Sequence, residues 1–277
     1  MKKIYLTLIV VLLAFAGCKK SEDSSTPGNT GGDGITVAEV NTALVIKHTG
    51  SACPPCGGWG WVANEDIIST NKENAAFMSA YSQNFVAKLF ITQTATDLDA
   101  AWGVTGYPTW SADGVLQLDR PNGGVNVTSE KAKVKAEVEA HKAAPVVANT
   151  GFTTSFNGDI MTIKTKTKFF KPASGDYRVA VYVLEDGVVG AQSGHASTPN
   201  VSHHHVMRGA AKLDGASTAP TWGETVATGS ITAGTEVSKT YTMDVKGFNK
   251  DNLEVVVVIW KKDLGKYIFV NASTNQK

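Results

Sequence analysis

The 277-residue sequence has few cysteines and almost no excess of charge of either sign, and both shortages exclude classes of protein. Its 26 lysine and arginine residues are balanced by 25 aspartate and glutamate residues, and no long run of one sign occurs. Binding to a phosphate backbone requires a concentrated positive field, so we expect no nucleic-acid partner. With three cysteines the chain cannot supply two CxxC pairs, which excludes a four-cysteine zinc site.

The sequence also lacks a long hydrophobic run. Its longest, from Ile4 to Ala16, is too short for a typical bilayer-spanning helix, and two lysines precede it. A charged start followed by such a run predicts a signal peptide over residues 1–17. The run ends in Phe15-Ala16-Gly17-Cys18, which resembles the lipobox of bacterial lipoproteins. The resemblance implies that the Cys18 sulfur carries diacylglycerol; the alternative is an ordinary secretory signal with a chance cysteine.

Residues 18–35 are rich in Ser, Gly, Thr and charged side chains, a composition that cannot bury a core. They predict a flexible tether. The charges directly after the cysteine resemble the export signal that sends lipoproteins of Bacteroidota to the cell surface. We therefore expect contact with a membrane through the N-terminal lipid, and a location in the cell envelope, at the outer membrane and on its surface.

Residues 36–144 predict an α/β domain with the element order β-α-β-α-β-β-α. Apolar runs indicate the strands, helical spacing indicates the helices, and Asp113-Gly114 is typical of a hairpin turn. The predicted elements are strands Ala43 to Thr49 and Ala75 to Tyr81, helices Trp61 to Asn71, Asp97 to Trp102 and Ser129 to Ala144, and a hairpin from Pro108 to Leu118.

The motif Cys53-Pro54-Pro55-Cys56 follows the first of these strands. If Cys18 is lipidated, the two motif cysteines have only each other as partners in an oxidising exported compartment. The free N–H groups and dipole at a helix start stabilise a thiolate, so we expect Cys53 to be the more exposed sulfur and to attack, and Cys56 to resolve. The two prolines remove backbone donors, which leaves more of this stabilisation to the Cys56 amide. Half a zinc site is the alternative, but it needs further ligands.

A second motif, Val104-Thr-Gly-Tyr-Pro-Thr109, resembles the cis-proline loop of the thioredoxin superfamily. The resemblance covers residues 36–144 and implies a thioredoxin-like fold. It also implies that Pro108 is cis and lies against the CxxC motif, and that Tyr107 and Pro108 bind an extended protein or peptide substrate carrying a thiol or disulfide. An ordinary trans turn proline is the alternative.

The sequence departs from the thioredoxin pattern in two places. Ala52 replaces the tryptophan usual before the first cysteine, and the buried acid of the family has no evident counterpart, because the strand carries Lys47 and His48 instead. Proton transfer is therefore unassigned; His48 is a candidate shuttle, although a structural role is the commoner one for such a histidine. Trp59 and Trp61 either flank a peptide groove or contribute to the core.

From Pro145 onward the helical periodicity disappears, which predicts a second, all-β domain over residues 145–277. Strands at this spacing predict an antiparallel sandwich of immunoglobulin-like type, without its disulfide. The expected strands are Val147 to Phe156 and Ile160 to Phe169, joined at Asn157-Gly158, and Tyr177 to Glu185, Val237 to Val245, Leu253 to Trp260 and Tyr267 to Ala272.

His203-His204-His205 is the segment richest in metal-ligand side chains. Alternation along a strand allows at most His203 and His205 to share a metal, and no acidic partner is evident, so we expect no metal site. The segments His203 to Arg208 and Tyr267 to Ala272 resemble the outer membrane protein twenty-eight-related lipoproteins of Bacteroidota. That resemblance implies a signal peptide, a thioredoxin-like domain and a β-rich C-terminal domain.

Two functions remain open from the sequence. One is thiol-disulfide exchange on extracytoplasmic proteins by Cys53 and Cys56. The other is binding or adhesion, with the thioredoxin-like unit as a scaffold and the cysteines in a permanent disulfide. No P-loop or dinucleotide fingerprint occurs, so we expect no cofactor. Fold alone does not decide between the two functions.

Overall fold

The computed structural model describes residues 34–82 and 90–276. The predicted signal peptide, the predicted lipidation site Cys18 and the predicted tether as far as residue 33 lie outside the described residues. The side chain of Ile35 is already buried. None of the described helices is long and apolar enough to cross a membrane.

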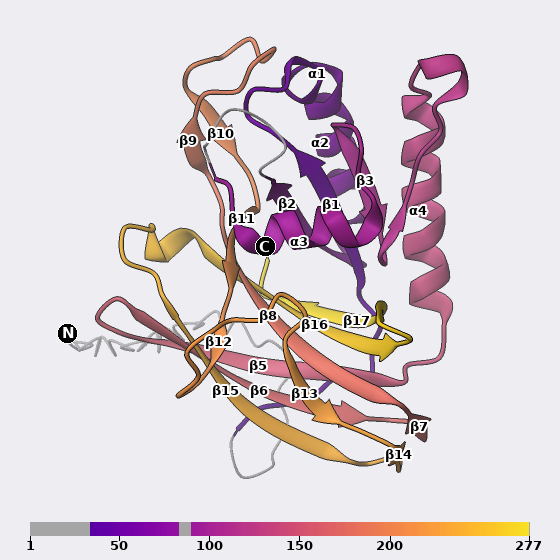
Figure 1. Cartoon of the computed structure of the whole chain (residues 1–277), viewed down its shortest axis with the longest axis vertical. Helices are drawn as coiled ribbons and strands as arrows, with labels where there is room; N and C mark the ends of the chain where they lie inside the picture. Colours follow the sequence, from indigo (N-terminus) through magenta and orange to yellow (C-terminus); the bar gives the residue numbers. More distant parts are fainter. Residues whose placement is uncertain (1–33, 83–89, 277) are drawn as a thin grey trace, which may run out of the picture.

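The N-terminal region is a mixed α/β layer structure (Figure 1). Its two buried strands, β1 and β2, run parallel, and β3 pairs with β1 in the antiparallel direction. The β3–β4 hairpin at Asp113-Gly114 completes the edge of the sheet. The elements are β1 (Ala43–Thr49), α1 (Pro54–Gly57), α2 (Trp59–Asn71), β2 (Ala75–Tyr81), α3 (Gln93–Trp102), β3 (Thr109–Ala112), β4 (Val115–Leu116), η1 (Pro121–Gly123) and α4 (Val127–Ala143).

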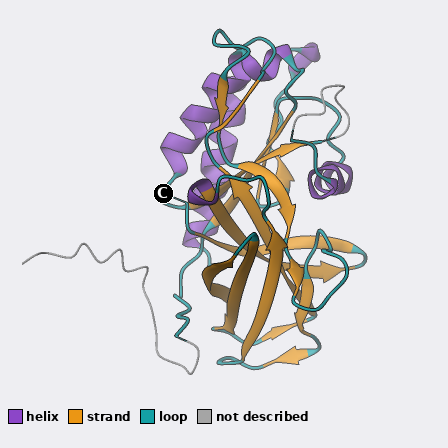
Figure 2. Cartoon of the chain, turned by 90° about the vertical axis from the view of Figure 1, so that its left-hand side faces the viewer, coloured by secondary structure: helices purple, strands orange, loops and turns teal. Residues whose placement is uncertain are grey.

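Helices cover both faces of this sheet, which explains why every residue of β1 and β2 is buried. Val45 packs with residues of α2 and α4, such as Ile67 and Val134, whereas Ile46 packs on the other face with Leu98 of α3. Figure 2 shows α3 on the side of the sheet opposite the other long helices. The alternation of β1 side chains between two apolar layers is what its continuous hydrophobic sequence encodes.

The C-terminal region is rich in strands and consists mainly of two packed sheets. β12, β15, β6 and β5 form one sheet in that order, and β8, β16 and β17 belong to the other. The elements are β5 (Ala148–Asn157), β6 (Ile160–Phe169), β7 (Ala173–Ser174), β8 (Asp176–Glu185), β9 (Val188–Gly190), β10 (Val201–His203), β11 (Val206–Ala210), β12 (Lys212–Leu213), β13 (Glu224–Ala227), β14 (Ser230–Ile231), β15 (Glu236–Asp244), η2 (Lys250–Asn252), β16 (Leu253–Asp263) and β17 (Lys266–Thr274).

The predicted long elements are present with ends that differ by no more than four residues from those expected, and β1, β2 and β6 have the expected ends. The hairpin of β5 and β6 pairs Asn157 with Ile160, so the turn residues are Gly158 and Asp159, with Gly158 at a φ of 56° that favours glycine. The sequence did not predict β9, β10 or β11, which are only three to five residues long. An immunoglobulin-like topology stays a prediction.

The two regions share one sheet. β11 pairs with β2 through Val206 and Ser79 on one side and with β8 on the other, which joins the strands in the order β17-β16-β8-β11-β2-β1-β3-β4. They also share a hydrophobic core, because Leu98 of α3 and Trp260 of β16 belong to one buried cluster. The domain boundary predicted at Pro145 falls between α4 and β5. Each region has a buried apolar cluster of its own, and a third cluster is shared across the boundary.

Candidate functional site

The two cysteines of the motif lie at the start of α1 and form a disulfide, with Cα atoms 5.2 Å apart. Cys53 is the N-cap residue, and its Sγ accepts a hydrogen bond from the Cys56 N–H at 3.2 Å. Pro54 and Pro55 carry no N–H, so Cys56 supplies the first amide of the helix that can reach this sulfur. The sequence predicted this dependence on the Cys56 amide.

The Tyr107–Pro108 peptide bond is cis, as the sequence predicted. The proline ring lies against the start of α2: a Cβ placed on Gly60 would lie 2.3 Å from Pro108 Cγ and 3.0 Å from the carbonyl oxygen of Pro55. Gly60 thus lets the proline loop and the CxxC turn approach each other closely. Arg120 stabilises the loop, because its Nη2 donates a hydrogen bond to the Pro108 carbonyl oxygen at 2.7 Å.

A segment of the C-terminal region covers the CxxC turn. This cap segment, residues 191–200, connects β9 to β10, which lie near α1 in Figure 1. The Gln192 side chain donates to the carbonyl oxygens of Gly50, at 3.2 Å, and Cys53, at 3.1 Å. The Ser193 N–H donates to the Ser51 carbonyl oxygen at 2.8 Å. The cap is therefore hydrogen-bonded to the loop before Cys53 and to Cys53 itself.

Glycines on both sides make this contact possible. A Cβ on Gly57 would lie 2.2 Å from the Ser193 carbonyl oxygen, and a Cβ on Gly194 would lie 2.2 Å from the Pro54 carbonyl oxygen. Gly194 also has a φ of 80°, which other residues rarely adopt. Only glycine fits at either position without moving the backbone of one partner.

The prediction that Cys53 is the more exposed of the two sulfurs stays a prediction, because the structure buries both cysteines. Cys53 is 1% exposed and Cys56 is 0% exposed, so both sulfurs are closed to a protein substrate in this conformation. The sequence offered no signal for this burial, because the cap lies about 140 residues further along the chain and has no motif of its own.

Trp59 and Trp61, the two tryptophans of α2, lie in different surroundings. Trp59 packs against Trp110 in the core between the sheet and the helices. Trp61 lies under the cap, with ring centroids 4.8 Å from His195 and 5.5 Å from His203. Trp59 is half-buried and packs against the core, which is one of the two roles that the sequence left open.

Lys47 and His48 point to opposite faces of β1, as alternation in a strand requires. The His48 ring is completely buried, with Nδ1 2.6 Å from Asp99 Oδ1 and Nε2 3.0 Å from Ser111 Oγ. Asp99 also accepts a hydrogen bond from the Tyr107 hydroxyl. Asp99 therefore links His48 to the proline loop. This buried acid was not predicted from the sequence, because it lies on α3 rather than on β1.

Lys47 is buried on the other face, with Nζ 4.8 Å from the centre of the Trp61 ring. Burial lowers the pKa of Lys47 from 10.5 to about 8, and the nearby Glu65 carboxylate only partly opposes this shift. A lysine here costs stability whenever it is charged in the folded chain.

Replacement of Lys47 by methionine is expected to raise the free energy of unfolding by about 1 to 3 kcal/mol at pH 7. Between pH 8 and pH 10.5 the unfolded wild-type chain binds more protons than the folded one, so wild-type stability rises with pH in this window. The difference in free energy of unfolding between Lys47→Met and the wild type is therefore largest below pH 8 and declines toward pH 10.5. Urea unfolding of both proteins at pH 7 and pH 10 measures it, and an equal difference at the two pH values would contradict the pKa assignment.

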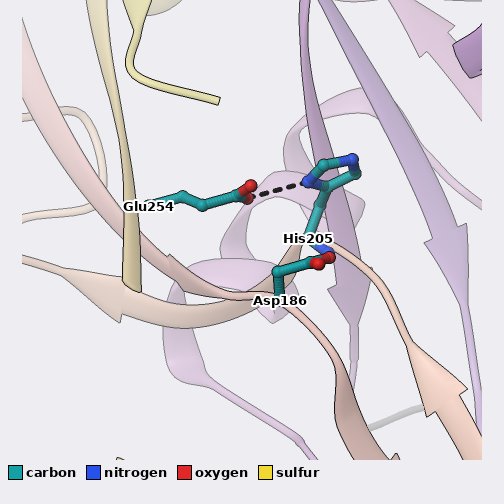
Figure 3. Close-up of side chains that lie close together, drawn as sticks. All are labelled: Asp186, His205 and Glu254. Atoms are coloured by element: carbon teal, nitrogen blue, oxygen red, sulfur yellow. Dashed lines mark hydrogen bonds and ion pairs between the residues drawn. The ribbon is translucent and has the colours of Figure 1, made fainter. Parts of the chain in front are cut away.

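The three consecutive histidines have three different partners. Two of these partners are carboxylates, so the expectation that no acidic partner is present is wrong. His203 is fully buried, its Nδ1 lies 2.7 Å from the Tyr81 hydroxyl, and burial is the main cause that lowers its pKa to about 4. His204 Nδ1 lies 2.9 Å from Asp186 Oδ1, a hydrogen bond that lowers the pKa of Asp186 and raises that of His204. His205 Nδ1 lies 2.8 Å from Glu254 Oε2 (Figure 3).

His203 and His205 therefore do not share a site. His205 has a φ of 53°, which ends the strand alternation on which the sequence argument relied. Its acidic neighbours come from the end of β8 and the start of β16, so they were invisible to an argument from local spacing.

Comparison with known proteins shows the family of this chain. The family described as Outer membrane protein Omp28 matches residues 95–272, from α3 to β17. The chain belongs to the Omp28 family. Both segments that suggested this resemblance, 203–208 and 267–272, lie within the match, whereas Cys53 and Cys56 precede it. Membership of the Omp28 family indicates a protein of the outer membrane or cell envelope.

Solved structures add evidence about the fold of this Omp28 family member. HBP35 of Porphyromonas gingivalis matches with a TM-score of 0.65 at 15% identity, over 87% of this chain and 76% of that one, which is a likeness in fold. The curli protein CsgC of E. coli matches with a TM-score of 0.23 at 12% identity, over 47% of this chain and 99% of that one. That score is too low to carry an argument. No curated protein matches the sequence.

Proposed function

We propose that the chain is a lipid-anchored outer-membrane protein that exchanges thiols and disulfides with extracytoplasmic proteins through Cys53 and Cys56. The observation that carries this proposal is the disulfide at the start of α1 beside the loop of Pro108. The strand order β2-β1-β3-β4, with helices on both faces, supports a thioredoxin-like unit over residues 36–144.

In the reducing direction, the Cys53 thiolate attacks one sulfur of a substrate disulfide and displaces the other as a thiolate. The Cys56 thiolate then attacks the Cys53 sulfur, which releases the second substrate thiolate and restores the Cys53–Cys56 bond. Two electrons pass from the pair to the substrate, and the reverse sequence oxidises a substrate dithiol. Tyr107 and Pro108 are the residues that we assign to substrate binding, next to the disulfide.

Replacing Cys56 with serine is expected to trap substrates, because Cys53 then has no internal thiol to release them. Reductant-sensitive adducts of Cys56→Ser should be recovered from intact cells and separated on non-reducing gels. Cys53→Ser is the matched control and should give few adducts. Equal trapping by both variants, or none by either, would contradict the assigned roles.

The second candidate is a binding protein in which the cysteines form a permanent structural disulfide and the β-rich region recognises the partner. The burial of both sulfurs under the cap segment favours it. The two candidates differ in one measurable property: a structural disulfide resists mild dithiol reductants in the native protein, whereas an exchanging one is reduced by them.

The anchor rests on Cys18, which follows the small residues Ala16 and Gly17 and precedes a segment with no capacity to form a core. Metabolic labelling with a fatty acid is expected to mark the wild-type chain and not Cys18→Ser, which should leave the membrane fraction. Retention of label and of membrane attachment in Cys18→Ser would contradict the anchor.

A further inference from the structure

Asp186, His205 and Glu254 form a cluster that the function proposed above does not use. One ligand-capable atom from each residue lies within 4.8 Å of those of the other two. Figure 3 shows the three side chains pointing toward one another from separate segments. These segments are the end of β8, the turn between β10 and β11, and the start of β16.

The backbone around His205 is held in place by its neighbours. The His205 N–H donates to Asp186 Oδ1 at 3.2 Å, and its carbonyl oxygen accepts from the Ser79 N–H at 2.8 Å. Gln276 lies on the other side, with Nε2 3.2 Å from Glu254 Oε2. The same Nε2 also lies 3.2 Å from His205 Nδ1, so the ring and the Glu254 carboxylate are oriented by each other and by Gln276. A bound ion would therefore meet ligands that are already oriented.

The donor set suits one class of ion. His205 Nδ1 and Glu254 Oε2 lie 2.8 Å apart, so a proton or a cation must lie between their lone pairs. An imidazole nitrogen with two carboxylates is a common ligand set for zinc and similar ions, whereas Mg²⁺ and Ca²⁺ prefer oxygen ligands alone.

An ion can reach the cluster from solvent. The three residues line a cavity of about 740 Å³ together with the acidic residues Glu65 and Asp251 and the basic residue Lys72. The Asp186 side chain is 38% exposed, whereas those of His205 and Glu254 are 12% and 14% exposed. The ligands are thus sheltered enough to hold an ion and open enough to leave a coordination position for water or an external ligand.

We propose that Asp186, His205 and Glu254 bind one divalent transition-metal ion of the zinc class. The site lies outside the thiol chemistry and does not depend on it.

The test is a calorimetric titration of the purified, oxidised chain with ZnCl₂, without a histidine tag and after chelator treatment. The oxidised disulfide removes the cysteines as ligands. We expect one Zn²⁺ per chain and at least tenfold weaker binding of Mg²⁺. His205→Asn, which tolerates the positive φ, and the isosteric Glu254→Gln should each weaken Zn²⁺ binding at least tenfold.

His141→Ala is the matched control, because His141 also pairs with a carboxylate, Asp113, at 3.1 Å, but this pair does not belong to the three-residue cluster. It should bind Zn²⁺ as the wild type does. The variants' thermal unfolding without metal verifies that they fold. Absence of one-to-one binding, equal affinity for Mg²⁺, or unchanged affinity in both folded cluster variants would overturn the proposal.

Discussion

Trp260→Ala is expected to lower the free energy of unfolding by about 3 to 5 kcal/mol, the range typical of a large aromatic side chain removed from a core. Trp260 is 0% exposed and its indole N–H donates to the Tyr182 hydroxyl at 3.1 Å. Its ring lies 6.1 Å from that of Trp102 on α3 and 5.1 Å from that of Trp222. The substitution thus removes contacts between the two regions as well as within one.

The N-terminal and C-terminal regions share a sheet and the buried cluster that contains Trp260. Removal of the Trp260 side chain should therefore destabilise the two regions together. Urea unfolding followed by far-ultraviolet circular dichroism gives the change in free energy, and alkylation of Cys53 and Cys56 in the presence of reductant reports on the N-terminal region separately. We expect the two midpoints to shift by the same amount. Val62→Ala, at a position 67% exposed on α2, is the control and should change stability by no more than about 0.5 kcal/mol.

Two separate transitions in Trp260→Ala, with the cysteines protected to the wild-type midpoint, would contradict a shared core. That outcome would mean that the N-terminal region is stable without the β-rich region and that the domain boundary at Pro145 is also a boundary of folding.

Gly194→Ala is expected to speed reduction of the Cys53–Cys56 disulfide by about ten- to a hundredfold, in native protein under mild dithiol reductant. The new Cβ would lie 2.2 Å from the Pro54 carbonyl oxygen, a clash that only a displacement of the cap segment relieves. Overpacking of this kind costs about 1 to 3 kcal/mol, and each 1.4 kcal/mol is a tenfold change in the population of the displaced cap. Quenched-flow alkylation of the freed thiols measures the rate.

Gly215→Ala is the matched control. Gly215 has the same φ of 80°, but a Cβ there has no neighbour within 4 Å, so the substitution adds the backbone strain without the clash at the cap. It should leave the reduction rate near that of the wild type. Equal rates in the wild type and Gly194→Ala would show that the cap does not limit access to the sulfurs.

The two candidate functions predict different consequences of this displacement. If the pair exchanges with substrates, Gly194→Ala in the Cys56→Ser background should increase the yield of mixed disulfides with protein partners. If the disulfide is structural, displacement of the cap should speed its chemical reduction and lower stability without producing such adducts. The double variant therefore separates the role of the cap from the role of the cysteines.

The local elements could be predicted from the sequence because their signals are local. The apolar run from Ala43 to Thr49 forms a buried strand, Val134 and Val138 form the buried face of α4, and Asp113-Gly114 turns a hairpin. Resemblance to motifs also identified the CxxC pair and the Tyr107–Pro108 cis bond. These features depend on side-chain spacing and backbone preference within about ten residues.

Contacts between distant segments were decided only by the tertiary structure. Three such contacts are the cap over Cys53, the buried Asp99 beside His48, and the approach of Asp186 and Glu254 to His205. The residues that they join lie 19 to 139 positions apart. The strand β11, which fuses the two regions, pairs with β2 through a single residue pair. Spacing along the chain specifies which residues of a strand point to the same face of a sheet. It does not specify which distant segment packs on that face, because this depends on strand register and on packing across the whole core. That information is present only in the folded chain.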